Sequence, residues 1–332
     1  MHLSDKQKKI LMLLSDGQFH SGTELAEALG VSRSAICKQF KSLSELGIQH
    51  SAISGKGYRL DYALELLDLT TITQGLSQEH QRLISILEIH DSINSTNSYL
   101  VDYAQQHAAS GIVCFAEHQS AGKGRRGRTW VSPYGSNLYM SILWRFQQGG
   151  IAATAGLSLA IGIAVIRALK QHHIDDVSLK WPNDIYSQGK KLGGILIEVS
   201  GETDGPCSAV IGLGLNLFLP ASEAQTITQA WTDLTTVTGI VPVSRNQLAA
   251  TLISHILTIV NGFETVGIQT YLDEWRSYDC LQGHLATLYI GQQKIDGLVE
   301  GIDDNGLLLI KRADGTIQAF ASGEVSFSDS IV

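Results

Sequence analysis

The sequence predicts an α+β protein of three domains, and three observations support this. The first segment is basic and contains two short helices joined by a tight turn. The middle region alternates apolar strands, apolar helices and glycine-rich loops, which indicates a mixed or antiparallel sheet backed by helices. The last segment consists of short strands separated by turn residues. We expect the domains at 1–62, 84–275 and 276–332, with a linker at 63–83.

Composition indicates an ordinary globular protein. The 332 residues are 44% hydrophobic and 17% charged, with a formal net charge of −8. This charge argues against a protein whose main task is to coat nucleic acid. The charge is uneven, however, because residues 1–60 hold eight basic and five acidic side chains. A basic end on an acidic body suggests a separate module with an anionic partner.

The compartment expected from the sequence is the cytoplasm. The charged N-terminus does not resemble a signal peptide. The apolar run at 151–169 is interrupted by Gly156, Gly162 and Arg167, which favours a buried helix over a membrane span. The scattered cysteines show neither metal-ligand spacing nor a disulfide framework; they are Cys37, Cys114, Cys207 and Cys280.

Residues 1–62 predict a helix-turn-helix with a wing. Ser21 and Glu24 have the spacing of a capping box, and Gly30 is positioned to end the helix that they begin. Ser32 can cap a second helix that runs to about Leu46. Residues 48–60 then predict a two-stranded wing that turns at 55–57.

The exposed face of the second helix predicts DNA binding. It carries polar and basic side chains of the types that contact bases and phosphates, and a lysine lies at the wing tip. A small helical cap without a DNA role is the alternative. Specific binding would favour a dimer that presents two copies to a two-fold site. The candidate contacts are Arg33, Ser34, Lys38, Gln39 and Lys56.

The most informative stretch of the middle region is 122–128, in which four cations and three glycines share seven positions. Glycines permit close backbone approach to a ligand, and exposed N–H groups form an anion-binding concavity. The stretch therefore predicts a loop that folds around an anion such as a nucleotide or acyl phosphate. The alternatives are a solvated basic loop or a nucleic-acid patch.

Other features of the middle region lie before and after this loop in the sequence. Ser95 precedes a periodic segment and is expected to cap a helix. Lys180 lies on an otherwise apolar strand, where a lysine either extends to solvent or contacts an anion. Residues 221–238 are polar and irregular and contain Trp231, which suits either a mobile flap or a structural role. We expect long helices at 151–170 and 244–263.

The last segment predicts a small SH3-like β-barrel without a catalytic set. Its expected strands, separated by glycine and Asp-Gly turns, are 285–290, 293–302, 306–311 and 316–319.

Five motifs in this order resemble the biotin–protein ligases along nearly the whole chain. The winged helix resembles the type that also represses transcription of biotin genes. The resemblance implies a class II synthetase-like central domain. One departure is Lys123, which stands where the family usually has arginine. Lysine keeps the positive charge but cannot make the bidentate hydrogen bonds that arginine makes to a carboxylate or phosphate. The motifs are 95–97, 122–128 followed by Trp130, 180–184, 191–196 and 212–216.

The resemblance implies a role for each motif. Ser95, Thr96, Asn97 and Gln119 would line the pocket for the biotin ureido group, and Lys123, Gly124 and Arg125 would close over the carboxylate and phosphates. Lys180 and Arg125 would act on the reacting oxygens. Stacking of Trp231 on adenine is a weaker expectation, from its position in the irregular segment. The expected nucleotide contacts are Arg125, Arg126, Arg128, Asn183 and Trp231.

The resemblance also implies two half-reactions. Biotin and Mg-ATP would give biotinyl-5′-adenylate and pyrophosphate, and a lysine of a biotin carboxyl carrier protein would then accept biotin. The adenylate would serve as corepressor by favouring a homodimer on biotin operator DNA. The magnesium ligands stay unassigned. Alternatives are a lipoate or octanoate ligase, a non-catalytic acid sensor, and a ligase whose winged helix no longer binds DNA.

Overall fold

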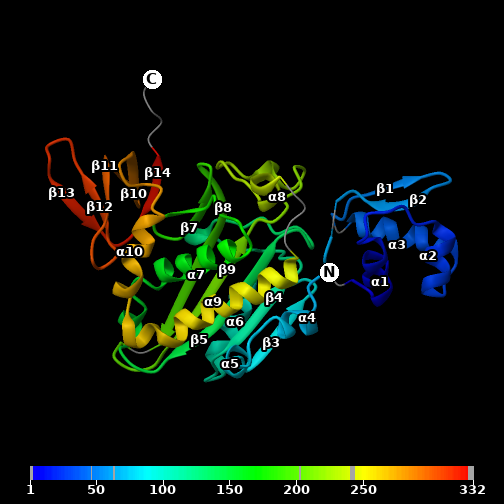
Figure 1. Ribbon diagram of the computed structural model, residues 1–332, viewed down its shortest axis with the longest axis horizontal. Helices are drawn as coiled ribbons and strands as arrows, with labels where there is room; N and C mark the ends of the chain where they lie inside the picture. Colours follow the sequence, from blue (N-terminus) through cyan, green and yellow to red (C-terminus); the bar gives the residue numbers. More distant parts are fainter. Residues whose placement is uncertain (1–2, 46, 63, 202, 240–243, 328–332) are drawn as a thin grey trace.

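The computed structural model describes residues 3–45, 47–62, 64–201, 203–239 and 244–327. Figure 1 shows a small helical unit at one end, a large sheet with its helices in the middle, and a second sheet at the other end. The order of the three units therefore follows the order of the sequence.

The N-terminal unit is a winged helix-turn-helix. Ser21 and Glu24 form the predicted capping box, and Gly30 ends the helix in the left-handed region at φ 63°. The wing strands pair antiparallel, with His50 opposite Leu60. The elements are α1 (Asp5–Leu14), α2 (Gly22–Leu29), α3 (Arg33–Glu45), β1 (His50–Ile53) and β2 (Gly57–Leu60).

The central sheet has seven strands in the order β3-β4-β5-β9-β8-β7-β6. Only the β3–β4 pair is parallel among these strands, so the sheet is mixed, as the sequence predicts. The strands are β3 (Ile86–His90), β4 (Ile112–Ala116), β5 (Leu138–Phe146), β6 (Ser178–Lys180), β7 (Asp184–Ser187), β8 (Lys190–Gly201) and β9 (Cys207–Leu215).

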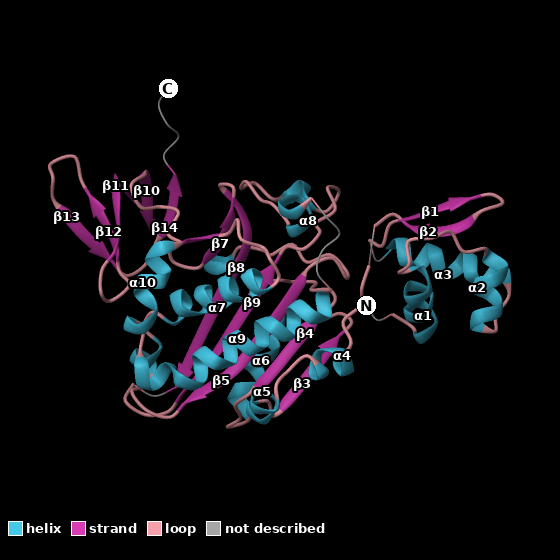
Figure 2. Cartoon of the chain, viewed as in Figure 1, coloured by secondary structure: helices cyan, strands magenta, loops and turns pink. Residues whose placement is uncertain are grey.

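Helices cover both faces of this sheet (Figure 2). On one face α6 (Thr96–Gln106) packs in a core that includes Leu100 and Leu143. The other face carries α7 (Leu157–Gln171) and α9 (Arg245–Val266), and α10 (Gln269–Ser277) packs on α7. Residues 151–171 and helix α9 are long and apolar enough to cross a membrane, but about half of each lies buried in the protein.

The helix expected at 151–170 is shorter in the structure. A 3-10 turn, η2 (Ile151–Thr154), comes first, and α7 begins only at Leu157. Between them Gly156 takes a φ of 75°, which an α-helix does not accommodate. The side chain of Ile268 lies where a Cβ at this glycine would be. The break therefore results from close packing against the segment before α10.

The predicted linker contains two helices that the sequence analysis did not include. They are α4 (Leu69–Gln74) and α5 (Gln78–Leu83), each capped by an acidic or hydroxyl side chain. Ile72 and Leu76 are buried in the same core as the central sheet. This part of 63–83 therefore belongs structurally to the central unit. The exact domain boundaries stay predictions.

The C-terminal sheet has five antiparallel strands in the order β13-β12-β11-β10-β14. No pairing between β13 and β14 closes it among the described residues, so the SH3-like barrel stays a prediction. The structure also has a strand, β14, and a helix in 221–238 that the sequence pattern did not predict. The elements are β10 (Leu285–Ile290), β11 (Gln293–Ile302), β12 (Leu308–Lys311), β13 (Ile317–Phe320), β14 (Glu324–Phe327), η3 (Ala224–Thr226) and α8 (Leu234–Thr238).

Specific contacts join the winged helix to the central unit. Lys8 forms an ion pair with Asp91 at 2.8 Å. Gln49 donates a hydrogen bond to the hydroxyl of Ser222 at 2.9 Å. Tyr134 of the central unit belongs to the apolar core of the winged helix. The two units therefore share polar contacts and a small apolar surface.

A buried ion pair fixes the chain where these units meet. Arg245, at the start of α9, lies 2.8 Å from the Glu117 carboxylate, and both side chains are about 5% exposed or less. The second Glu117 oxygen accepts a hydrogen bond from the backbone of Leu67 at 2.6 Å. Arg245 also donates to the carbonyl of Asn137. One buried charge pair thus holds the connecting segment, β4 and α9 together.

Removing one member of this pair should destabilise the protein strongly. Glu117→Ala would leave the Arg245 guanidinium buried without its counter-charge, so the free energy of unfolding should fall by about 3–5 kcal/mol. Urea denaturation of the full chain measures this. Asp273→Ala is the matched control, since its pair with Arg276 is exposed and its loss should change little. Equal effects from the two variants would contradict the structural role of Glu117.

Candidate functional site

The motifs of the middle region converge on one cavity. It encloses about 930 Å³ and is lined by the start of α6, the 122–128 loop, strands β6 to β9 and β14. Residues 226–230, in the irregular segment before α8, form a further wall. Segments far apart in the sequence, between Ser95 and Phe327, therefore build this cavity.

One end of the cavity is polar but uncharged. The Gln119 side-chain oxygen accepts a hydrogen bond from the backbone N–H of Thr96 at 2.9 Å. The hydroxyl of Ser141 lies 2.7 Å from the hydroxyl of Thr96 and 2.6 Å from the side-chain oxygen of Asn97. These residues are nearly inaccessible to solvent. Such a fixed set of amide and hydroxyl groups suits a small neutral ligand group with donors and acceptors.

Ser95 brings this set together, because it is the N-cap of α6. Its hydroxyl accepts from the backbone of Ser98, as predicted, and the next two residues occupy the first helical turn. Asn97 donates a hydrogen bond to the Glu198 carboxylate at 2.9 Å, which holds its amide in one orientation. A local helix start thus positions three residues at the cavity wall.

Two glycines of β9 permit this packing. A Cβ on Gly212 would lie 2.1 Å from the side-chain oxygen of Asn97. A Cβ on Gly214 would lie 2.4 Å from the indole of Trp130. Glycines within a strand permit such close approach, and here the Asn97 and Trp130 side chains occupy the space that a Cβ would take. The Trp130 indole N–H is buried and has no hydrogen-bond partner among the described residues.

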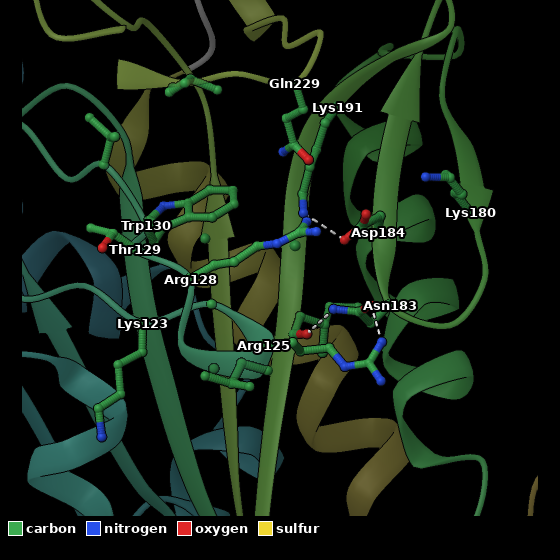
Figure 3. Close-up of a pocket in the computed structure, with 18 of the residues that line it drawn as sticks. Lys123, Arg125, Arg128, Thr129, Trp130, Lys180, Asn183, Asp184, Lys191 and Gln229 are labelled. Atoms are coloured by element: carbon green, nitrogen blue, oxygen red, sulfur yellow. Dashed lines mark hydrogen bonds and ion pairs between the residues drawn. The ribbon is translucent and has the colours of Figure 1, made fainter. Parts of the chain in front are cut away.

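The other end of the cavity is cationic (Figure 3). Arg125 donates a hydrogen bond to the Asn183 side chain at 3.0 Å and another to the carbonyl of Gly323 at 3.4 Å. Burial lowers the pKa of Arg125, and the charge of Arg126 lowers it further. Arg126 takes a φ of 54°, which costs backbone energy in a non-glycine residue. The loop is therefore held in a demanding conformation around the Arg125 side chain.

Two loop arginines contact the C-terminal sheet. Arg128 forms an ion pair with Glu324 of β14 at 2.5 Å and lines the cavity. Arg126 donates to the carbonyl of Tyr289 in β10 at 3.3 Å, and it is exposed outside the lining. The C-terminal sheet therefore both closes the cavity and supplies a counter-charge to its loop.

Two lysines face the cavity from β6 and β8, the strands on either side of β7. Lys180 donates to the hydroxyl of Tyr186 at 3.2 Å, and burial lowers its pKa although Asp184 partly offsets this. Lys191 pairs with the Asp184 carboxylate at 2.7 Å and lies over the Trp130 ring. Lys191 is only 13% exposed. Figure 3 shows the ion pair between Lys191 and Asp184 as a dashed line.

Most of the predicted site residues line this cavity, and two do not. Arg126 and Trp231 are not among the lining residues. Trp231 instead pairs by its backbone with the start of β8. Adenine stacking by Trp231 stays a prediction that its position does not support. The residues that the structure does bring together are Ser95, Thr96, Asn97, Gln119, Lys123, Gly124, Arg125, Arg128, Lys180 and Asn183.

The sequence analysis assigned no role to Lys191. It follows exposed Lys190 at the start of a hairpin strand, and such pairs are usually solvated. Lys191 lies opposite Tyr186 of β7, and the β7–β8 pairing shifts register between Ile185 and Tyr186. The signal available in the sequence was the Gly193-Gly194 pair, which leaves room beside Lys191 for the Trp130 ring.

The candidate DNA contacts lie on the outer surface of the winged helix. Arg33, Ser34 and Lys38 are exposed on α3, and Lys56 is exposed between β1 and β2. Gln39 is half-buried. The position of four of the five residues is compatible with the predicted role.

The Gly212 contact gives a stability prediction. Gly212→Ala should lower the free energy of unfolding by about 1–3 kcal/mol, because its methyl group collides with buried Asn97. In Gly262→Ala, on α9, the added methyl meets no atom within 4 Å, so it should raise stability by roughly 0.5–1 kcal/mol. Urea denaturation measures both. A Gly212→Ala protein as stable as the parent would contradict the close contact.

Comparisons with known proteins agree with this architecture. Residues 89–216 match the Biotin/lipoate A/B protein ligase family, residues 6–59 match an HTH domain, and residues 286–328 match the Biotin protein ligase C terminal domain. The biotin protein ligase from Aquifex aeolicus in complex with biotin and ATP superposes with a TM-score of 0.62. It is 28% identical, covering 74% of this chain and 100% of that one.

Two curated relatives cover nearly the whole chain. The bifunctional ligase/repressor BirA of Escherichia coli K12 is 41% identical over 96% of both chains. The bifunctional ligase/repressor BirA of Bacillus subtilis is 30% identical over 96% of this chain and 98% of its own. With the winged helix, the cationic cavity and the C-terminal sheet in place, the chain belongs to the biotin–protein ligase family, in its bifunctional ligase/repressor branch.

Proposed function

We propose that the cavity joins biotin to ATP to give biotinyl-5′-adenylate, and that the protein then transfers biotin to a lysine of a biotin carboxyl carrier protein. The observation that carries this proposal is one cavity that has a neutral hydrogen-bonding end and five cations in its lining. Those cations are Lys123, Arg125, Arg128, Lys180 and Lys191. A neutral ring and two anions would be accommodated together in it.

The neutral end suits the ureido group of biotin. That group carries two N–H donors and a carbonyl acceptor, and the buried amides and hydroxyls of Thr96, Asn97 and Gln119 offer complementary partners. Met140, Leu213 and the Trp130 ring provide apolar surface beside them. Because hydrogen bonds within the protein hold these side chains in place, biotin would lose little free energy to reorganisation.

The cationic end suits the meeting of a carboxylate with an α-phosphate. Two anions repel each other, and charge accumulates on the phosphoryl oxygens in the transition state. Arg125, Lys180 and Lys191 lie where they would reduce both penalties. Lys191 would also contact the transferred group, since its ammonium lines the cavity and lies over the Trp130 ring.

The nucleotide would lie toward Arg128, Asn183 and residues 226–230. Asn183 is fixed by donating to the carbonyl of Ile195 at 2.7 Å. Magnesium ordinarily supports ATP chemistry by neutralising phosphate charge. The cavity's carboxylates, Asp184 and Glu324, are engaged by Lys191 and Arg128, so they do not form a free oxygen set for a resident ion.

The winged helix would make the protein a repressor of biotin genes in the cytoplasm. Its exposed basic side chains match the needs of a DNA-contacting helix and wing. The adenylate would act as corepressor by ordering the 122–128 loop, which would favour a homodimer on operator DNA. Arg125 and Arg128 already connect that loop to two other parts of the chain.

The first test is acid-dependent exchange of pyrophosphate into ATP, with biotin, lipoate and octanoate assayed in parallel. Exchange should occur with biotin alone. Exchange with lipoate or octanoate would favour a sister ligase, and no exchange with any acid would favour a sensor without catalysis.

The same assay tests the lysines. Lys191→Gln and Lys180→Gln should each slow biotin-dependent exchange by about 10²–10³-fold, because each removes a charge that stabilises the phosphoryl oxygens. Lys190→Gln is the matched control, since Lys190 is exposed and does not line the cavity. Exchange that survives one substitution would remove that lysine from the mechanism.

Adenylate formation should also promote self-association. Sedimentation velocity of the wild-type protein should show tighter dimerisation with biotin plus ATP than without them. Lys191→Gln, slow to form the adenylate, should respond only weakly to the same substrates. An association constant that substrates leave unchanged would contradict the corepressor role without affecting the ligase proposal.

A further inference from the structure

A second group of chemically reactive side chains lies outside the cavity, under α6. Glu88 and His90 come from the edge strand β3, and Cys114 comes from the neighbouring strand β4. Glu88 and Cys114 are direct partners in the parallel pairing, and His90 lies two residues along on the same face. The sheet register therefore places a carboxylate, an imidazole and a thiol side by side.

The three ligand atoms lie within 4.8 Å of one another. The Nε2 atom of His90 is 3.6 Å from the Glu88 carboxylate. In a tetrahedral site with bonds of about 2 Å, two ligand atoms are roughly 3.3 Å apart. Small side-chain rotations would therefore bring all three atoms to bonding distance from one ion.

The His90 imidazole supplies an independent indication of a ligand. Its Nε2 atom is buried and makes no hydrogen bond with the described residues. A buried polar atom of this kind ordinarily has a partner. The Tyr99 ring lies at 4.9 Å from the imidazole, edge-on, which orients it. The nitrogen is thus directed at Glu88 without a bonded neighbour.

Tyr99 also acts on the carboxylate. Its hydroxyl donates a hydrogen bond to Glu88 at 3.3 Å, and this contact, with burial, raises the pKa of Tyr99 to about 12. Outer hydrogen bonds to a ligating carboxylate are typical of metal sites, because they fix the ligand's orientation. The Glu88 and His90 side chains are each 28% exposed, so an ion could enter from solvent.

We propose that Glu88, His90 and Cys114 bind one zinc ion, with water as the fourth ligand and Tyr99 as the orienting partner. Mixed oxygen, nitrogen and sulfur donors match the ligand preferences of zinc. The ion would join β3 to β4 beneath α6, the helix whose first turn carries Thr96 and Asn97. The site would therefore stabilise the support of the neutral end of the cavity.

Binding would exchange a proton for the ion. Zinc binds cysteine as the thiolate, so Cys114 must lose its thiol proton when the ion binds. The metal–sulfur bond forms as the S–H bond breaks, and the proton goes to the buffer. Zinc keeps its oxidation state, so the step requires no oxidant or reductant.

The experiment is a titration of the chelator-treated full chain with Co²⁺, followed by displacement with Zn²⁺. One equivalent of Co²⁺ should produce a thiolate-to-cobalt absorption band, and Zn²⁺ should remove it. Calorimetry with Zn²⁺ in two buffers of different ionisation enthalpy should show release of one proton per ion, because zinc binds cysteine as the thiolate.

Three variants separate this site from adventitious binding. Cys114→Ser and His90→Gln should each abolish the cobalt band, and His90→Gln changes a partly exposed side chain that the fold tolerates more readily. Tyr99→Phe should retain the band but weaken zinc binding by about 10–100-fold. Cys37→Ser is the matched control, because Cys37 is exposed in the winged helix and should not matter.

Two outcomes would overturn the proposal. One is the absence of a thiolate band in the wild-type protein at one equivalent of cobalt. The other is a band that survives both Cys114→Ser and His90→Gln but is lost with Cys37→Ser, which would assign the metal to the winged helix. Neither outcome would bear on adenylation, since pyrophosphate exchange is measured separately.

Discussion

The constraint on which the rest of this structure depends is the repulsion between cations gathered in one cavity. Five basic side chains line it. Asp184 and Glu324 neutralise two of them, at Lys191 and Arg128, while amide and carbonyl oxygens receive the Arg125 guanidinium. These partners come from β7, β14 and the turns beside them. The protein must therefore assemble distant strands before the cavity is electrostatically stable, and anionic substrates would complete the neutralisation.

The backbone around the cavity also helps to position its side chains. The glycines of β9 allow the Asn97 and Trp130 side chains to lie directly against the sheet. Because Glu117 is buried two residues before Gln119, its ion pair with Arg245 also fixes the strand end that positions the Gln119 amide. Stability and substrate binding thus depend on neighbouring residues of one short segment.

Local signals in the sequence were enough to predict the winged helix and a sheet backed by helices, whereas the residues that line the cavity were expected from the family resemblance. The capping box at Ser21, the N-cap at Ser95 and the glycines of β9 each require specific local geometry, so the residue type reveals it. Features set by distant packing were missed. Gly156 breaks a helix because Ile268 packs there, and Lys191 enters the cavity through the pairing of β7 with β8. Neither partner is evident from the adjacent sequence.

The contacts between the 122–128 loop and the C-terminal sheet have a consequence for how the sequence can evolve. Arg126 and Arg128 lie about 160 to 200 positions before their partners Tyr289 and Glu324, so the site is encoded in two separate stretches of the gene. Exchange of the C-terminal domain between homologous proteins would replace Tyr289 and Glu324 but leave their loop partners Arg126 and Arg128 unchanged. Chimeric proteins are therefore expected to require a 122–128 loop and a C-terminal domain from the same parent. Substitutions in these two stretches should be correlated among homologues.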